Sequence, residues 1–399
     1  MSCACDRVNL TTADRKNKPP RAISRRRPTL GALAALGLLV LLMLYPDAVV
    51  AAMQRGLQRC ALRVVPALFP FLVVSELLVR SRVGELFPPM LLRPVCRLFR
   101  ISHYGALCWV MGVLCGFPVG MRAAAAYARQ GLISQEELGH LLCFCNVPGS
   151  AFLINAVGLS LMGSVRYGRA LLLLCLLSSA LVGAVLGRMH RAEVSLTLEA
   201  SAPRMEDTGR NRVSTLSEAL AGAASGMLGI VATVCFFAAL LGAVFSLPLP
   251  LIDCGLPRAI LAGLLEITSG VCEAVTLGDG MLTAVTCAAV AGWAGLSVHC
   301  QLIAVCEGFS LPLGRFFVAR LLQAALCGAG MALLWRLGAV DILRGGSSTE
   351  SALLLRGGGG EEAWLCYALL CAVAWVVAGV VGACHGKRRR VRTDEQARA

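Results

Sequence analysis

Ionisable and hydroxyl side chains in this sequence stand at short polar breaks in long apolar segments. Glu266 is followed by Thr268 and Ser269 in the run Glu-Ile-Thr-Ser-Gly. At a helix break inside a membrane, a carboxylate, hydroxyls and free backbone carbonyls can together bind a cation or carry a proton. These three residues are therefore predicted to couple the protein to a proton or a sodium ion. A purely structural helix cap is the alternative.

Glu76 and His299 are two further candidates for ion or proton coupling. Glu76 lies in an apolar run, where an ionisable group is a functional candidate by default because its charge is costly in hydrocarbon. His299 lies at another break, and imidazole titrates near neutrality. Two plainer interpretations stay open, namely a position of Glu76 at the membrane interface and an interior hydrogen bond of His299.

The turn Gly-Phe-Pro-Val-Gly at residues 116–120 has the chemistry of an anion site. Free N–H groups and the dipole at a helix start favour an anion, and the guanidinium of Arg122 suits a carboxylate. A positive-inside arginine at the membrane edge is the alternative. Residues 146–150 form a second break, in which an amide and a hydroxyl can form hydrogen bonds. The predicted substrate-binding residues are Gly116, Phe117, Pro118, Gly120, Arg122, Asn146, Gly149, Ser150 and Ser297.

The composition indicates which class of protein positions these residues. Of the 399 residues, 57% are hydrophobic and 15% are charged, and the mean hydropathy is +0.73. This apolar content exceeds what one globular core needs and predicts an all-α polytopic membrane protein in a lipid bilayer. The net charge of +14 gathers in tails and short loops. That distribution fits positive-inside orientation and argues against a nucleic-acid partner.

About eight transmembrane helices plus re-entrant half-helices are predicted, because a crossing needs ~20 apolar residues and several runs are interrupted. Basic residues precede the first apolar run and follow the last, so both termini are expected in the cytoplasm. A cleaved signal peptide at the start is the alternative. The predicted segments are a basic cytoplasmic tail (1–28), a first membrane repeat (29–187), a polar loop (188–213), a second membrane repeat (214–340), a Gly-rich polar loop (341–362), a C-terminal transmembrane helix (363–384) and a basic cytoplasmic tail (385–399).

The breaks recur in the two halves of the chain. In chain order, the first break (116–120) corresponds to the third (266–270), and the second (146–150) to the fourth (295–299), each pair about 150 residues apart. Broken helices at matching positions are typical of transporters with a site between two repeats. Two structural repeats are therefore predicted. The alternative is a chance recurrence of small residues, which are common at helix interfaces.

Several strings in a fixed order resemble the YlbJ-like sporulation integral membrane proteins. They are Pro-Ala-Leu-Phe-Pro-Phe from residue 66, the first break with Met-Arg after it, Ile-Ser-Gln-Glu-Glu from residue 133, Phe-Cys-Asn from residue 144, the third break, and the fourth break with Cys-Gln after it. The resemblance runs from about residue 30 to residue 335 and implies nucleoside-recognition (Gate) domains. Family members often have Gly-Pro after the asparagine, whereas here Gly149 is followed by Ser150.

The resemblance implies a protein of spore-forming Firmicutes, made in the mother cell and associated with moving dipicolinic acid across the outer forespore membrane. Secondary transport of a small anionic solute is therefore expected, in the cell membrane or the outer forespore membrane, with both termini on the mother-cell side. A nucleoside transporter and a non-transporting scaffold of a sporulation complex are the alternatives, and a homo-oligomer is left open. Because the sequence has no zinc-protease, serine-hydrolase or Walker motif, neither an enzyme nor a cofactor is expected.

Overall fold

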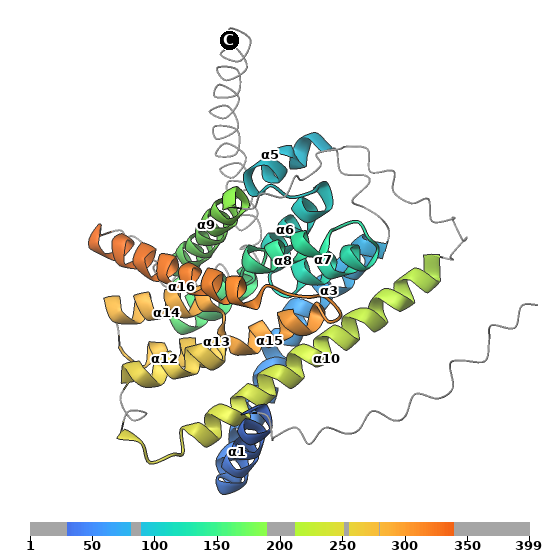
Figure 1. Ribbon diagram of the computed structural model, residues 1–399. Coiled ribbons are helices and arrows are strands. Elements are labelled where there is room, and N and C mark those ends of the chain that lie inside the picture. Colours follow the sequence, from blue (N-terminus) through green and yellow to red (C-terminus); the bar gives the residue numbers. More distant parts are fainter. Residues whose placement is uncertain (1–29, 81–88, 190–211, 251–254, 279, 339–399) are drawn as a thin grey trace, which may run out of the picture. The chain divides into compact units, whose positions relative to one another are not determined.

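The computed structural model describes residues 30–80, 89–189, 212–250, 255–278 and 280–338. The described residues form helices and connecting segments with no strand among them, which confirms the all-α class (Figure 1). The predicted tails, the Gly-rich loop and the C-terminal helix at 363–384 lie outside the described residues, as does most of the central polar loop. Helix α1 (Leu30–Leu44) is a unit of its own, and a second unit begins at Tyr45 and contains all the other described helices.

The first half of this second unit consists of short helices separated by breaks. In chain order they are α2 (Pro46–Arg59), the π-helix η1 (Cys60–Val64), α3 (Val65–Arg80), α5 (Pro89–Phe99), α6 (His103–Cys115), α7 (Val119–Arg129), α8 (Gln135–Phe144), the π-helix η2 (Ala151–Leu161) and α9 (Val165–Met189). The first break separates α6 from α7, and the second separates α8 from η2. Both breaks therefore interrupt helices where the glycines and prolines of the sequence predict it.

The second half has the same alternation of helices and breaks. It consists of α10 (Arg212–Val244), α12 (Gly255–Leu265), α13 (Ile267–Val275), α14 (Met281–Trp293), α15 (Gly295–Val305) and α16 (Leu313–Arg336). The third break begins at Glu266, which separates α12 from α13, and the fourth follows Ala294, which separates α14 from α15. The other residues of both breaks form the first turns of α13 and α15. Each break thus ends one helix and begins another, so each leaves helix ends whose backbone groups need partners.

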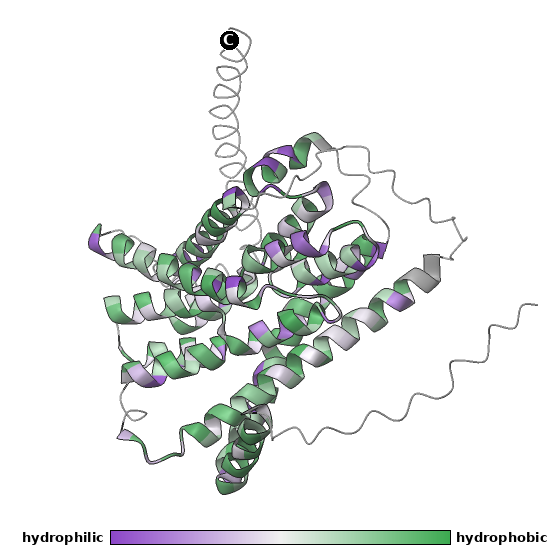
Figure 2. Cartoon of the chain, viewed as in Figure 1, coloured by the Kyte–Doolittle hydropathy of each residue, from purple (hydrophilic) through white to green (hydrophobic). Residues whose placement is uncertain are grey.

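Four stretches of described helix are long and apolar enough to cross a membrane, namely Val165–Met189, Leu216–Val244, Met281–Val305 and Leu313–Arg336. The number rises to six if two bent pairs of consecutive helices each count as one span. Figure 2 shows how apolar residues dominate these helices. The chain is therefore an integral membrane protein with several apolar helices. The predicted count of about eight crossings stays a prediction, since the last predicted span lies outside the described residues.

Helix α9 shows the outer surface that such a protein needs. Leu173, Leu177, Leu181 and Val185 follow one another at four-residue intervals and are 40%, 47%, 52% and 43% exposed. This spacing places them on one face of the helix. A continuous exposed stripe of aliphatic side chains is what a lipid-facing helix presents, whereas a water-soluble protein rarely exposes large apolar patches.

Small residues let the inner helices approach closely. Helix α10 packs against both α2 and α3, and its crossing with α3 can be followed in Figure 1. A Cβ atom on Gly242 of α10 would lie only 2.6 Å from the Cβ atom of Ala52 on α2. Without a hydrophobic driving force between helices in lipid, such close packing is the main source of their association. The packed helices position the four breaks next to one another.

Candidate functional site

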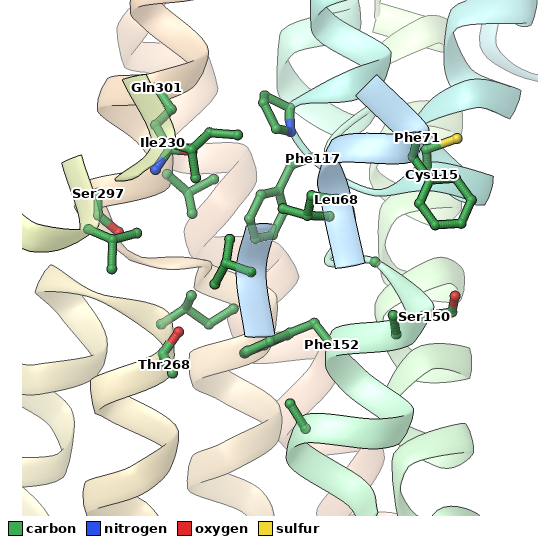
Figure 3. Close-up of a pocket in the computed structure, with 18 of the residues that line it drawn as sticks. Leu68, Phe71, Cys115, Phe117, Ser150, Phe152, Ile230, Thr268, Ser297 and Gln301 are labelled. Carbon is green, nitrogen blue, oxygen red and sulfur yellow. The ribbon is translucent and has the colours of Figure 1, made fainter. Parts of the chain in front are cut away.

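All four breaks contribute residues to one pocket of about 330 Å³ (Figure 3). The π-helices η1 and η2 and helices α3, α6, α10 and α15 complete its wall. Residues as far apart in the sequence as Val64 and Gln301 therefore meet at one place. The pocket is lined by the predicted site residues Phe117, Pro118, Gly149, Ser150, Glu266, Thr268 and Ser297.

The first and second breaks cross each other in direct backbone contact. The backbone N–H of Phe117 donates a hydrogen bond of 3.0 Å to the carbonyl oxygen of Val147. Gly116 has a φ of +80°, and a Cβ atom on it would lie 2.6 Å from the Cα atom of Gly149. A side chain at position 116 would therefore meet both backbone strain and a backbone clash.

The third and fourth breaks cross in a similar way. Gly295 has a φ of +84°, and a Cβ atom on it would lie 2.9 Å from the backbone nitrogen of Ile267. The residue before it, Ala294, has a φ of +72° and ends α14 in the left-handed conformation. Both halves of the chain thus contain a pair of crossed breaks with a positive-φ glycine at the crossing.

Glu266 caps helix α13 with both of its carboxylate oxygens. Oε1 accepts a hydrogen bond of 2.9 Å from the backbone N–H of Thr268, and Oε2 accepts one of 2.6 Å from that of Ser269. The side chain is buried, although it borders the pocket. A negative charge at a helix N-terminus is stabilised by the helix dipole. The geometry matches the structural alternative, and the role of this residue in ion coupling stays a prediction.

Four helices begin at the pocket. Helix α7 begins after Pro118, η2 after Ser150, α13 after Glu266 and α15 at Gly295, and each has at least nine residues. The first N–H groups of a helix have no partner within it, and its N-terminus has a positive potential. Several sources of positive potential therefore converge on one cavity, and the Glu266 carboxylate offsets the one at α13.

Polar and apolar groups share the wall of the pocket. Figure 3 shows Phe117, Phe152 and Ile230 around the same space as Thr268 and Ser297. The hydroxyl of Ser297 is buried and has no hydrogen-bond partner. An unpaired buried hydroxyl is uncommon because its desolvation is not compensated. It is therefore available to a bound molecule.

Arg122 and Glu76 pair with each other away from the pocket wall. Nη2 of Arg122 lies 2.6 Å from Oε1 of Glu76 and donates a hydrogen bond of 2.9 Å to the carbonyl oxygen of Gly222. Arg80 extends the cluster, since it lies 3.7 Å from Glu76 and 2.7 Å from Glu218. This ion-pair cluster joins α3, α7 and α10. The predicted roles of Arg122 in substrate binding and of Glu76 in coupling stay predictions.

The remaining predicted residues do not line the pocket. Gly116 and Gly120 pack against neighbouring backbone, and the side-chain nitrogen of Asn146 donates to the Leu142 carbonyl at 2.8 Å. Nε2 of His299 lies 2.8 Å from the carbonyl oxygen of Trp293, as in the interior alternative. The predicted residues outside the pocket wall are Gly116, Gly120, Arg122, Asn146, Glu76, Ser269 and His299.

Sequence reasoning missed Arg320, Gln323 and several residues of the pocket. Arg320 and Gln323 of α16 are buried beside the second and fourth breaks. The sequence did contain a signal for this pair, namely an arginine inside an apolar run with a glutamine one helical turn later. A charge buried in a membrane needs specific partners, so such an arginine is a candidate for a functional or positioning role. In the pocket, Asn155 and Gln301 were missed because they lie beyond the breaks in ordinary helical sequence.

Comparison with known proteins gives one informative relative. The chain is 26% identical over 323 residues to the sporulation integral membrane protein YlbJ of Bacillus subtilis strain 168, a match that covers 73% of this chain and 79% of YlbJ. No family profile and no solved structure matches the chain. The predicted resemblance is confirmed as a likeness to YlbJ over most of the chain. The implied Gate domains stay a prediction.

Proposed function

We propose that this chain is a sporulation integral membrane protein that transports a small anionic solute through the pocket at the four breaks. The observation that carries the proposal is the convergence of four helix N-termini on one cavity with an unpaired hydroxyl. Involvement in sporulation rests on the likeness to YlbJ.

The charge distribution around the pocket favours an anion. A helix N-terminus is equivalent to about half a positive charge, and Glu266 offsets the one at α13. The N-termini of α7, η2 and α15 have no such acidic cap among the described residues. Ser297 adds a hydroxyl that can donate to a carboxylate, and the phenylalanines of the wall can contact an apolar body.

The crossed breaks also support transport over simple binding. In secondary transporters, discontinuous helices of two repeats form the site near the midplane, and the two halves move against each other around it. Here α6 to α9 and α12 to α16 each contain two breaks that cross at a glycine. We therefore propose that these two series of helices are structural repeats, with a proton or sodium ion as the coupling ion.

Dipicolinate is the solute to test first, because the YlbJ-like resemblance points to it. The outer forespore membrane would be the location, with the termini on the mother-cell side. A nucleoside transporter and a scaffold without transport remain the competing functions. They differ in outcome, since a scaffold gives no flux and a nucleoside carrier is inhibited by nucleosides.

The test is uptake of labelled dipicolinate into vesicles that contain the purified full chain. Ser297→Ala should raise the half-saturating concentration at least ten-fold, because a hydrogen bond to a charged group contributes about 1.5–3 kcal/mol. Ser246→Ala is the matched control, since its hydroxyl bonds to Gly242 on α10 and does not line the pocket. Vesicles that show no uptake above protein-free vesicles would refute transport of this solute, and inhibition by nucleosides would favour the nucleoside carrier.

A further inference from the structure

Arg320 of α16 connects the second and fourth breaks. Its Nη1 donates a hydrogen bond of 2.8 Å to the carbonyl oxygen of Asn146, and its Nε and Nη2 each donate one of 3.3 Å to that of Trp293. Asn146 follows the end of α8, and Trp293 is the last residue of α14. One side chain therefore bonds to the backbone at the start of the second break and just before the fourth.

The arginine is buried without an acidic partner. Its side chain is 1% exposed, and no described carboxylate forms an ion pair with it. A bare cation at this depth would be costly. The ends of α8 and α14 explain how it is stabilised, because each helix C-terminus is equivalent to about half a negative charge. Two such ends together balance one guanidinium.

The neighbouring side chains complete the same task. The last carbonyl groups of a helix lack partners within it. At the end of α8, Gln323 donates to the carbonyl oxygen of Cys143 at 3.0 Å, and Ser179 donates to that of Phe144 at 2.5 Å. Gln323 also accepts a hydrogen bond of 2.5 Å from Nη1 of Arg320, which fixes the orientation of the guanidinium.

The position of Arg320 gives it an effect on the pocket that it does not line. Each of the two breaks next to Arg320 is followed by a helix that begins at the pocket. These helices are η2 in the first half and α15 in the second. By binding the carbonyl groups of Asn146 and Trp293, Arg320 therefore also fixes the relative positions of the N-termini of η2 and α15. The positive charge also offsets the negative ends of α8 and α14, which lie behind those N-termini and would oppose an anion.

We propose that Arg320 is the positioning residue that holds the second and fourth breaks together, so that η2 and α15 present their N-termini to the same solute. The inference deepens the proposed function and rests on it for the role of the solute. The tie between the two breaks is testable without any solute. Its failure and the failure of the transport proposal can therefore be told apart.

The test is hydrogen exchange of the purified full chain, followed by mass spectrometry of peptides covering residues 144–150 and 293–299. Arg320→Met removes the charge and both bonds at similar volume, and we expect exchange in both segments to become at least ten-fold faster. Arg320→Lys keeps the charge without the planar fork and should give intermediate exchange in both. Arg336→Lys, at the exposed end of the same helix, is the matched control and should change neither segment.

Faster exchange in only one segment, or in neither, would overturn the proposal. An equal increase throughout α9 and α12 would also overturn it, because it would show a general packing role rather than a tie between two breaks. If Arg320→Met does not fold, the lysine variant decides, since a partial and joint loosening of both segments is expected from it alone. Absence of dipicolinate uptake by the unmodified chain would refute transport of dipicolinate and leave the exchange result standing.

Discussion

Substitution of the two crossing glycines should expose how much the pocket depends on the crossed breaks. At Gly116 an alanine would meet a φ of +80° with an extended ψ of −175°, and its Cβ atom would lie 2.6 Å from the Cα and N atoms of Gly149. Such a conformation costs about 1–3 kcal/mol for a residue with a side chain. Overpacking against backbone adds about 1–3 kcal/mol. Gly116→Ala should therefore lower the free energy of unfolding by about 2–6 kcal/mol.

The chain offers a control that separates strain from clash. Gly131 has a φ of +74° and no neighbouring atom within 4 Å of an added Cβ atom, so Gly131→Ala meets strain alone. In the second half, Gly295 and Gly278 form the same kind of pair, with φ values of +84° and +94° and open space only at Gly278. Gly116→Ala and Gly295→Ala should have clearly lower melting temperatures in detergent than their controls, and clearly lower rates of dipicolinate uptake. Equal stability and uptake within each pair would refute the crossing of the breaks.

Three further predictions concern charge and topology. Arg122→Ala should destabilise the protein by about 1–3 kcal/mol, because it leaves the partly buried Glu76 without its 2.6 Å partner. The control Arg129→Ala, at the exposed end of α7, should cost less. Reduced dipicolinate uptake at an unchanged melting temperature would instead indicate a direct role of Arg122 in binding. Glu266→Gln keeps one acceptor and leaves one N–H of α13 unpaired, so it should lower the free energy of unfolding by about 1–3 kcal/mol. If Glu266 couples transport to an ion, the same variant should abolish the dependence of uptake on a proton or sodium gradient. An intact dependence would contradict the coupling role. Labels at Asn17 and Thr393 should report the same side of the membrane, and opposite sides would exclude an even number of crossings.

The positions of the breaks were predictable from the sequence because a bilayer restricts where a helix can be interrupted. An unpaired backbone group is costly in hydrocarbon, so Gly-Pro interruptions must be buried in protein or line a wet cavity. The pattern therefore predicted that the first and fourth breaks belong to one site, and the pocket contains Phe117 and Ser297 from them.

The partners of the charged side chains were not predictable in the same way. Arg122 pairs with a residue 46 positions away, and Arg320 bonds to a carbonyl 174 positions away. Such contacts depend on how the helices pack, and no local spacing encodes them. Arg320 in particular bonds to backbone carbonyl groups. Because every residue has such a group, the residue types in the sequence do not show which ones are its partners.

Protection of a native cysteine tests most directly whether the pocket binds an anion. Cys115 lines the pocket, whereas Cys300 is an exposed residue of α15 that does not line it. The rate of alkylation at both thiols can be followed by mass spectrometry in the purified full chain as dipicolinate is added. Binding in the pocket predicts that dipicolinate slows alkylation of Cys115 in a saturable manner and leaves Cys300 unchanged. Unchanged alkylation of Cys115 at concentrations that saturate uptake, or equal slowing at both cysteines, would contradict a solute site at the four breaks.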